Sequence, residues 1–241
     1  MKTDDNIQWL KKDNTEEIPE PLKSLVENIQ WYGQSSVRIP FENKFIYVDP
    51  FQVTDKEMAN LVLITHSHFD HFSLDEINKI ANPDTLICAP KDCIEKLRNH
   101  GFKQYLEVVP DQTYTFGDIT IQTVPAYNTI KNNHPKEMGW VGYVISIGNL
   151  KIYHPGDTNR IPEMKAISCD ITFMPLGQTY TMQNVEEAAA AVLDVKAKVA
   201  IPFHYGIYEG GEESAVYFQQ ILTNNVITVI KECRNELQSI R

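Results

Sequence analysis

The chain has 241 residues, of which 42% are hydrophobic, and its formal net charge is −10. This length and hydrophobic content are enough for one buried core, and they argue against a disordered or collagen-like chain. A strongly acidic surface repels phosphate backbones, so we expect no nucleic acid as a partner.

The N-terminal residues lack the basic start and the apolar stretch of a signal peptide. No apolar run approaches the ~18 residues that are needed to span a bilayer. We therefore expect a cytoplasmic protein without a membrane span. None of the four cysteines forms a C-x-x-C pair, which disfavours a four-thiolate zinc site and predicts reduced, buried thiols: Cys88, Cys93, Cys169 and Cys233.

Residues 1–28 are polar and charged and are predicted to form an N-terminal extension, partly helical, before a single domain at 29–241. Short apolar runs separated by turns predict strands at 37–39, 45–48, 61–65, 85–88, 107–109, 113–116, 119–124, 141–147, 151–153, 171–174 and 199–203. Ser73 with Glu76, and Asn184 with Glu187, are spaced as helix N-caps with an acidic third residue. A further helix is predicted at 213–222, and strands precede helices in both halves of the chain.

The strongest chemical signal is the run His66-Ser67-His68-Phe69-Asp70-His71, which follows the buried strand predicted at 61–65. In extended backbone, residues i and i+2 point the same way, so His66 and His68 face one centre. Asp70 and His71 come as the chain turns and can face a second centre. Imidazole and carboxylate ligands suit zinc, manganese, iron or nickel. Crowding several histidines without a shared ligand would cost free energy, which favours a metal site over a chance cluster.

Other polar residues follow predicted strands in the same manner. Asp157 comes after the strand at 151–153, His204 after the strand at 199–203, and Asn128 after the strand at 119–124. Taken alone, each would more often be a turn residue or an ordinary buried side chain. Their shared position at strand ends favours a common site at one edge of the fold.

Together these motifs resemble the metallo-β-lactamase superfamily, and most closely the small bacterial and archaeal metal-dependent hydrolases related to ascorbate-phosphate lactonase. The resemblance covers roughly residues 29–222 and rests on H-x-H-x-D-H at 66–71, Gly156-Asp157-Thr158 and Phe203-His204-Tyr205-Gly206 in the right order. The segments at 31–36 and 47–51 are similar to the opening hairpin of the family.

The resemblance implies an α/β fold, the αββα four-layer sandwich, with a dinuclear metal site at one edge. It assigns His66 and His68 to the first metal and Asp157 to a bridging position. It assigns Asp70, His71 and His204 to the second metal.

The third motif departs from the family, because Asn128 stands where a histidine is common. An amide oxygen is a weaker zinc ligand than imidazole. His134 lies further along the same loop, and it is either a substitute ligand or an exposed loop histidine. Gln34 also stands where relatives often carry histidine, and we expect it to be no direct ligand. Asp49 either supports a ligand histidine or is a turn residue before Pro50.

We therefore predict a metal-dependent hydrolase that uses a metal-bound hydroxide on a small ester, lactone or phosphoester. The cofactor is expected to be a pair of divalent transition-metal ions, with zinc favoured over manganese, nickel or iron. Asp70 would orient the nucleophile or pass on its proton, and His154 and Tyr205 are candidates for supporting or substrate contacts.

The alternatives are an iron-dependent oxidoreductase of the same fold and a non-catalytic metal-binding protein. His68 favours hydrolysis, because diiron relatives often carry glutamate there. The sequence indicates neither the exact substrate, which we expect to be a small molecule, nor the oligomeric state.

Overall fold

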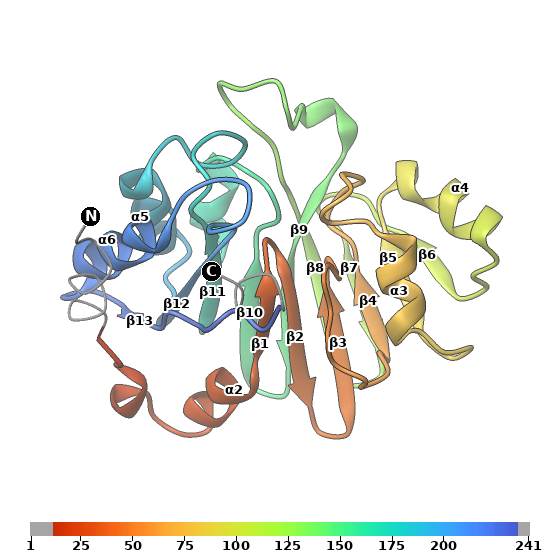
Figure 1. Ribbon diagram of the computed structural model, residues 1–241, viewed down its shortest axis with the longest axis horizontal. Helices are drawn as coiled ribbons and strands as arrows, with labels where there is room; N and C mark the ends of the chain where they lie inside the picture. Colours follow the sequence, from red (N-terminus) through yellow and green to blue (C-terminus); the bar gives the residue numbers. More distant parts are fainter. Residues whose placement is uncertain (1–11, 236–241) are drawn as a thin grey trace.

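The structure is a computed structural model that describes residues 12–235. Its strands form two sheets (Figure 1). The six-stranded sheet has the order β1 (Gln30–Gly33), β2 (Ser36–Phe41), β3 (Lys44–Val48), β4 (Leu61–Leu63), β5 (Leu86–Ala89) and β6 (Tyr105–Glu107). The seven-stranded sheet has the order β13 (Ile227–Thr228), β12 (Val199–Phe203), β11 (Ile171–Pro175), β10 (Leu150–His154), β9 (Val141–Ile147), β8 (Ile119–Pro125) and β7 (Thr113–Phe116).

Helices cover the outer faces of both sheets. Helices α3 (Leu74–Ile80) and α4 (Lys91–His100) lie on one side of the molecule, and α5 (Val185–Asp194) and α6 (Glu212–Leu222) lie on the other (Figure 1). The four-layer αββα sandwich predicted from the sequence is therefore confirmed. Each sheet begins with antiparallel strands and continues with parallel ones, from β3 to β6 and from β10 to β13. This repeated topology places the carboxyl ends of the parallel strands of each sheet at one edge.

The buried strand β4 shows why the predicted run at 61–65 is continuously apolar. Leu61 and Leu63 belong to the core between the two sheets, whereas Val62 and Ile64 contact the cluster beneath α3 and α4. Successive side chains of a strand point to opposite faces, so a strand covered on both faces has no polar position. The strand ends at Leu63 rather than at Thr65, because the Thr65 amide donates to the Asp49 side chain instead of to a neighbouring strand.

Short connecting helices complete the described chain. They are α2 (Leu22–Asn28) and the 3-10 helices η1 (Thr15–Glu17), η2 (Lys136–Met138) and η3 (Pro162–Ala166). The described part of the predicted extension contributes Ile18, Leu22 and Val26 to the main core, while residues 1–11 lie outside the described part. No helix within residues 12–235 is both long and apolar enough to cross a membrane.

Two predicted helix starts are confirmed. Ser73 Oγ accepts the Glu76 amide at 3.3 Å, and Asn184 Oδ1 accepts the Glu187 amide at 2.7 Å. The capping box at Ser73 is only half formed, because the Glu76 carboxylate accepts the amide of Val53.

The four cysteines are free, and Cys233 alone among them is partly exposed.

The sequence-based prediction was wrong at two places on the far side of the first sheet. Strand β6 occupies Tyr105–Glu107 rather than 107–109, because its register is set by pairing Tyr105 with Ile87 on β5. Helix α4 was not predicted. It buries only Cys93, Ile94 and Leu97, so its apolar pattern is sparse.

Candidate metal centre

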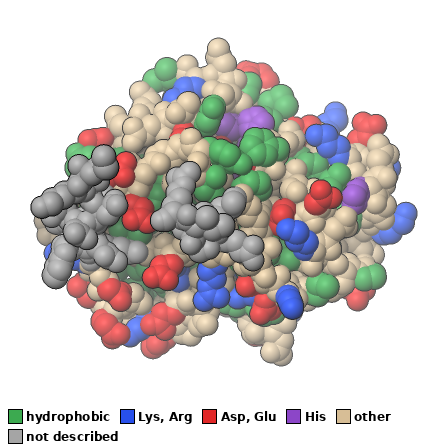
Figure 2. All heavy atoms as spheres, in the orientation of Figure 1, with side chains coloured by type: hydrophobic (Ala, Val, Ile, Leu, Met, Phe, Trp, Pro, Cys, Tyr) green, Lys and Arg blue, Asp and Glu red, His purple; other side chains and the backbone are tan. Residues whose placement is uncertain are grey.

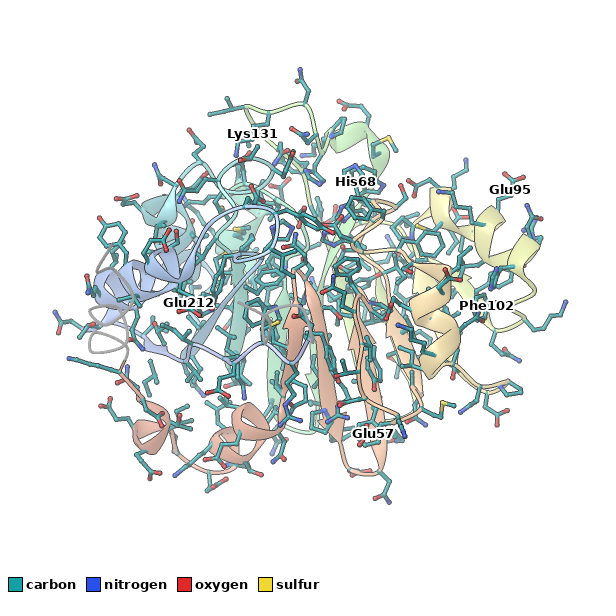
Figure 3. All side chains as sticks on the ribbon, in the orientation of Figure 1. Glu57, His68, Glu95, Phe102, Lys131 and Glu212 are labelled. Atoms are coloured by element: carbon teal, nitrogen blue, oxygen red, sulfur yellow. The ribbon has the colours of Figure 1, made fainter. Side chains whose placement is uncertain are left out.

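The polar residues at the strand ends meet at one edge of the sandwich. His66, His68, Asp70 and His71 follow β4, and Asp157 and His204 follow β10 and β12, respectively. Figure 3 shows His68 at this edge, below the loop that carries Lys131. The loop between β8 and β9 adds His134 to the same region.

A first group of donor atoms comes from three histidines, His66, His68 and His134, whose ring nitrogens lie within 4.8 Å of one another. Two of these nitrogens, His66 Nε2 and His68 Nδ1, are only 2.9 Å apart. The structure thus brings His134, and not Asn128, next to the two motif histidines.

Asn128 lies behind His134 in this arrangement. Its Oδ1 atom lies 3.0 Å from His134 Nδ1, and its backbone amide donates to the His134 carbonyl at 2.7 Å. An amide oxygen can only accept, so His134 Nδ1 carries the hydrogen and its Nε2 keeps a lone pair. Asn128 therefore orients the His134 imidazole.

A second group of donor atoms consists of Asp70, His71 and His204, again within 4.8 Å of one another. Asp157 lies between the two groups. Its Oδ2 atom is 3.4 Å from His134 Nε2, while its Oδ1 atom is 3.4 Å from His71 Nε2 and 3.1 Å from His204 Nε2. One carboxylate thus presents a different oxygen to each group.

The donor set fits metal ions. Among the described residues, His71 Nε2, His134 Nε2 and Asp157 Oδ1 are buried and make no hydrogen bond of ordinary geometry, which leaves them available to a metal ion. Two ligand atoms at about 2.1 Å from a tetrahedral ion lie roughly 3.4 Å apart. The separations of 3.1 to 3.4 Å around Asp157 match that value.

Asp49 fixes the His71 imidazole directly and the His66 imidazole through the Thr65 hydroxyl. Its Oδ2 atom accepts His71 Nδ1 at 2.7 Å and the Thr65 hydroxyl at 2.6 Å. Because that hydroxyl donates to Asp49, it accepts from His66 Nδ1, which is 3.0 Å away. Both imidazoles thereby direct Nε2 towards the donor groups. Such carboxylate–histidine contacts fix ligand tautomers in metal sites, and the supporting role considered for Asp49 agrees with these contacts.

Glu209 supports His204 in a similar position, a role that the sequence did not predict. Glu209 Oε1 lies 3.0 Å from His204 Nδ1, and Oε2 accepts the backbone amides of Thr179 and Tyr180. A Cβ atom at Gly177 would lie only 1.8 Å from Glu209 Oε1, so the carboxylate needs glycine there. The only sequence signal was an acidic residue in the loop after His204.

Trp140 covers one side of the first donor group, and the sequence did not predict this contact either. Its ring lies 4.9 Å from the His66 ring, 5.0 Å from the His68 ring and 5.5 Å from the His134 ring. Its Nε1 atom donates to Asp92 on α4 at 3.0 Å, which fixes the indole.

Gln34 contacts the second group without belonging to it. Its Nε2 atom donates to Asp70 Oδ2 at 3.1 Å and lies 3.3 Å from His204 Nε2. Gln34, Asp49 and His204 all have positive φ angles, of 44°, 47° and 58°. Few residues other than glycine adopt this region, so these three backbone conformations must be held by the surrounding contacts.

The electrostatics of the two groups differ. Burial and neighbouring imidazoles lower the pKa values of His66 and His68, so both stay neutral and keep lone pairs. Burial alone would lower the pKa of His204, but the Asp157 carboxylate raises it to about 10. The pKa of His71 is likewise raised, against burial, by Asp157 and Asp49. A metal ion would compete with these protons for the same negative field.

The two groups open into one pocket of about 440 Å³. Its lining comprises Gln34, His68, Phe69, Asp70, Asn133, His134, Asp157, Tyr180, His204 and Tyr208.

His154 and Tyr205, the two candidates for supporting or substrate contacts, lie elsewhere. His154 is buried with its Nε2 atom 2.8 Å from the Ser35 carbonyl, and Tyr205 is buried against Trp31. Neither side chain lines the pocket.

The contact between Asn128 and His134 gives a testable difference between two substitutions. His134→Ala removes a donor atom and should abolish metal binding at the first group while leaving the second. Asn128→Ala leaves the donor in place but frees its tautomer, so it should weaken the same group by about 10- to 100-fold. Metal titration of both variants checks this, with Asn132→Ala on the same loop as the control. Equal affinity in the parent and in both variants would show that neither residue contributes to metal binding.

Known proteins resemble this chain over most of its length. A family model described as the beta-lactamase superfamily domain matches residues 28–204. A UPF0173 metal-dependent hydrolase of Lysinibacillus sphaericus is 29% identical over 220 residues, which cover 84% of this chain and 96% of the relative. A second such hydrolase, from Thermoplasma acidophilum, is 31% identical over 200 residues, which cover 76% of this chain and 86% of the relative.

A solved structure is similar over most of the chain. It is that of a Parabacteroides distasonis protein assigned to the metal-dependent hydrolases, with a TM-score of 0.74 and 31% identity, covering 86% of this chain and 93% of that one. The chain therefore belongs to the β-lactamase superfamily, within which it is a metal-dependent hydrolase.

Proposed function

We propose that this hydrolase binds two divalent transition-metal ions. The first would be held by His66, His68 and His134, and the second by Asp70, His71 and His204, with Asp157 shared between them. The observation that carries this proposal is the position of Asp157, whose two oxygens face different donor groups at 3.1 to 3.4 Å. Nitrogen-rich ligand sets with carboxylates favour zinc, and manganese, nickel and iron are the other candidates.

The proposed reaction is the hydrolysis of a small ester, lactone or phosphoester. When bound, the metal ions would acidify water and polarise the substrate's carbonyl or phosphoryl oxygen. Asp70 is the chain's own acid–base group. It lines the pocket, and Gln34 holds its Oδ2 atom. Its Oδ1 atom accepts no hydrogen bond from the described residues, so that oxygen is available to receive a proton from an attacking water.

The remaining residues fix this geometry before substrate arrives. Asp49 and Glu209 hold His71 and His204 in one orientation, and Trp140 covers the three histidines of the first group. Preorganised groups need no rearrangement during the reaction, which is the main source of rate enhancement in such sites.

A hydrolase screen of the metal-loaded protein tests this proposal. Separate samples loaded with zinc, manganese or nickel would be assayed with carboxylic esters, lactones and phosphodiesters. We expect hydrolysis that a chelator abolishes and that re-addition of metal restores. Metal-loaded protein that hydrolyses nothing would support the non-catalytic alternative. Oxygen consumption by iron-loaded protein, without hydrolysis, would support the oxidoreductase alternative.

A further inference from the structure

Three large aromatic side chains stand exposed at the mouth of the pocket. Phe69, Tyr180 and Tyr208 line the pocket, and we call them the aromatic rim. Their exposed fractions are 66%, 43% and 52%. Figure 2 shows hydrophobic side chains, in green, gathered beside the histidines at the upper edge of the molecule. Exposed aromatic side chains that line a pocket can pack against a bound molecule.

The rim is held by contacts on both sides of the pocket. The Phe69 and Tyr208 rings lie 5.7 Å apart, and Phe51 contacts both rings from behind at 6.3 and 6.5 Å. Tyr180 is carried by a loop that Lys131 fixes. The Lys131 ammonium donates to the carbonyls of Gln178, Thr181 and Met182 at 2.6 to 3.0 Å.

The charge of the pocket restricts what it can bind. None of its described lining residues is lysine or arginine, and its two carboxylates, Asp70 and Asp157, belong to the donor groups proposed for the metal ions. Lys131, on the neighbouring loop in Figure 3, has its three donors directed to backbone carbonyls and cannot also bind an anion without releasing them. At the aromatic rim, a phosphate or carboxylate on the non-reacting part of a substrate would therefore meet aromatic rings and no cationic side chain.

We propose that the non-reacting part of the substrate is a neutral aromatic group, which packs against the aromatic rim. This inference rests on the proposed function and narrows its substrate class to compounds whose non-reacting part is aromatic and carries no anionic group. With a carboxylic ester as substrate, the water oxygen forms the new bond to the carbonyl carbon, the ester C–O bond breaks, and the protons of water end on the acid and alcohol products. The pocket volume of about 440 Å³ is suited to such a small molecule.

Binding of three amides to the zinc-loaded protein tests the inference without requiring turnover. The probes are 3-phenylpropanamide, propanamide and 3-(4-sulfophenyl)propanamide, titrated by calorimetry. We expect the phenyl compound to bind about tenfold more tightly than propanamide, because the ring leaves water for the rim. The negative charge of the sulfophenyl compound should abolish this tenfold gain in affinity. Equal binding of propanamide and the phenyl compound, or undiminished binding of the sulfonate, would overturn the inference.

Substitutions in the aromatic rim test whether these residues cause the preference for the phenyl compound. Phe69→Ala and Tyr208→Ala should each reduce the preference for the phenyl compound several-fold, whereas Phe69→Tyr should keep it. Tyr217→Ala is the matched control, since Tyr217 is similarly exposed at 44% but lies on α6 and does not line the pocket. Loss of the preference in Tyr217→Ala, or its survival in both rim variants, would contradict the assignment of the rim.

Kinetics separate this inference from the proposed function. The parent should hydrolyse methyl 3-phenylpropanoate with a kcat/KM about tenfold above that of methyl propanoate. Selective binding of the phenyl amide without hydrolysis of either ester would support the rim and count against the proposed ester hydrolysis. Hydrolysis of both esters at equal kcat/KM would support the hydrolase and overturn the rim.

Discussion

Replacing Asp157 by asparagine should lower metal affinity at both donor groups together, by more than about 100-fold. The reason is that one buried carboxylate faces His134 with one oxygen and both His71 and His204 with the other. An amide has the same size but no charge, so the negative field that holds two cations is lost. Competition titration with a chromophoric chelator measures the affinity of each site.

The control for this substitution is Asp118→Asn. Asp118 is an exposed carboxylate between β7 and β8 that pairs with Lys44, and its loss should leave metal binding unchanged. Circular dichroism of both variants checks that the fold is retained. Weakening of only one site in Asp157→Asn would show that the carboxylate is not shared, and the two groups would then be independent.

Asp70→Asn should reduce kcat by about 10²- to 10⁴-fold while leaving the fold intact. Asp70 lies on the loop before α3 and lines the pocket, so the substitution does not open the core. The asparagine can still accept the Gln34 hydrogen bond, but it cannot take up a proton. Activity, metal content and circular dichroism would be measured on the same preparation.

Asp75→Asn provides the matched control, because Asp75 is exposed in the first turn of α3 and close in sequence. It should keep parental activity. Metal content in Asp70→Asn separates two causes of inactivity: retained metal with lost kcat indicates proton transfer, whereas lost metal indicates a ligand role alone. Full activity in Asp70→Asn would remove Asp70 from the mechanism.

The fold and part of the site were readable from sequence because they depend on local pattern. The run at 61–65 is apolar at every position since both faces of β4 are covered, and this marked a central strand followed by the histidine motif. Asp157 and His204 were found because each follows a strand whose end lies at the same edge as the motif. These inferences need only strand periodicity and the geometry of parallel sheets.

The remaining features depend on how loops fold over the edge, which periodicity does not encode. The sequence did not indicate whether Asn128 or His134 lies beside the motif histidines. The fold of the loop between β8 and β9 decides this, because it brings His134 near His66. Glu209 is close to His204 in sequence, but its carboxylate is held by the distant amides of Thr179 and Tyr180, and Trp140 is held by the distant Asp92. The charge and aromatic content of the pocket likewise emerge only when separate loops come together.

The central claim is that two metal ions share Asp157, and elemental analysis of the zinc-reconstituted protein tests it most directly. After removal of loosely bound metal, the parent should retain about two equivalents per chain, and His134→Ala should retain about one. Retention of no metal by the parent, or an unchanged two equivalents in His134→Ala, would contradict the account.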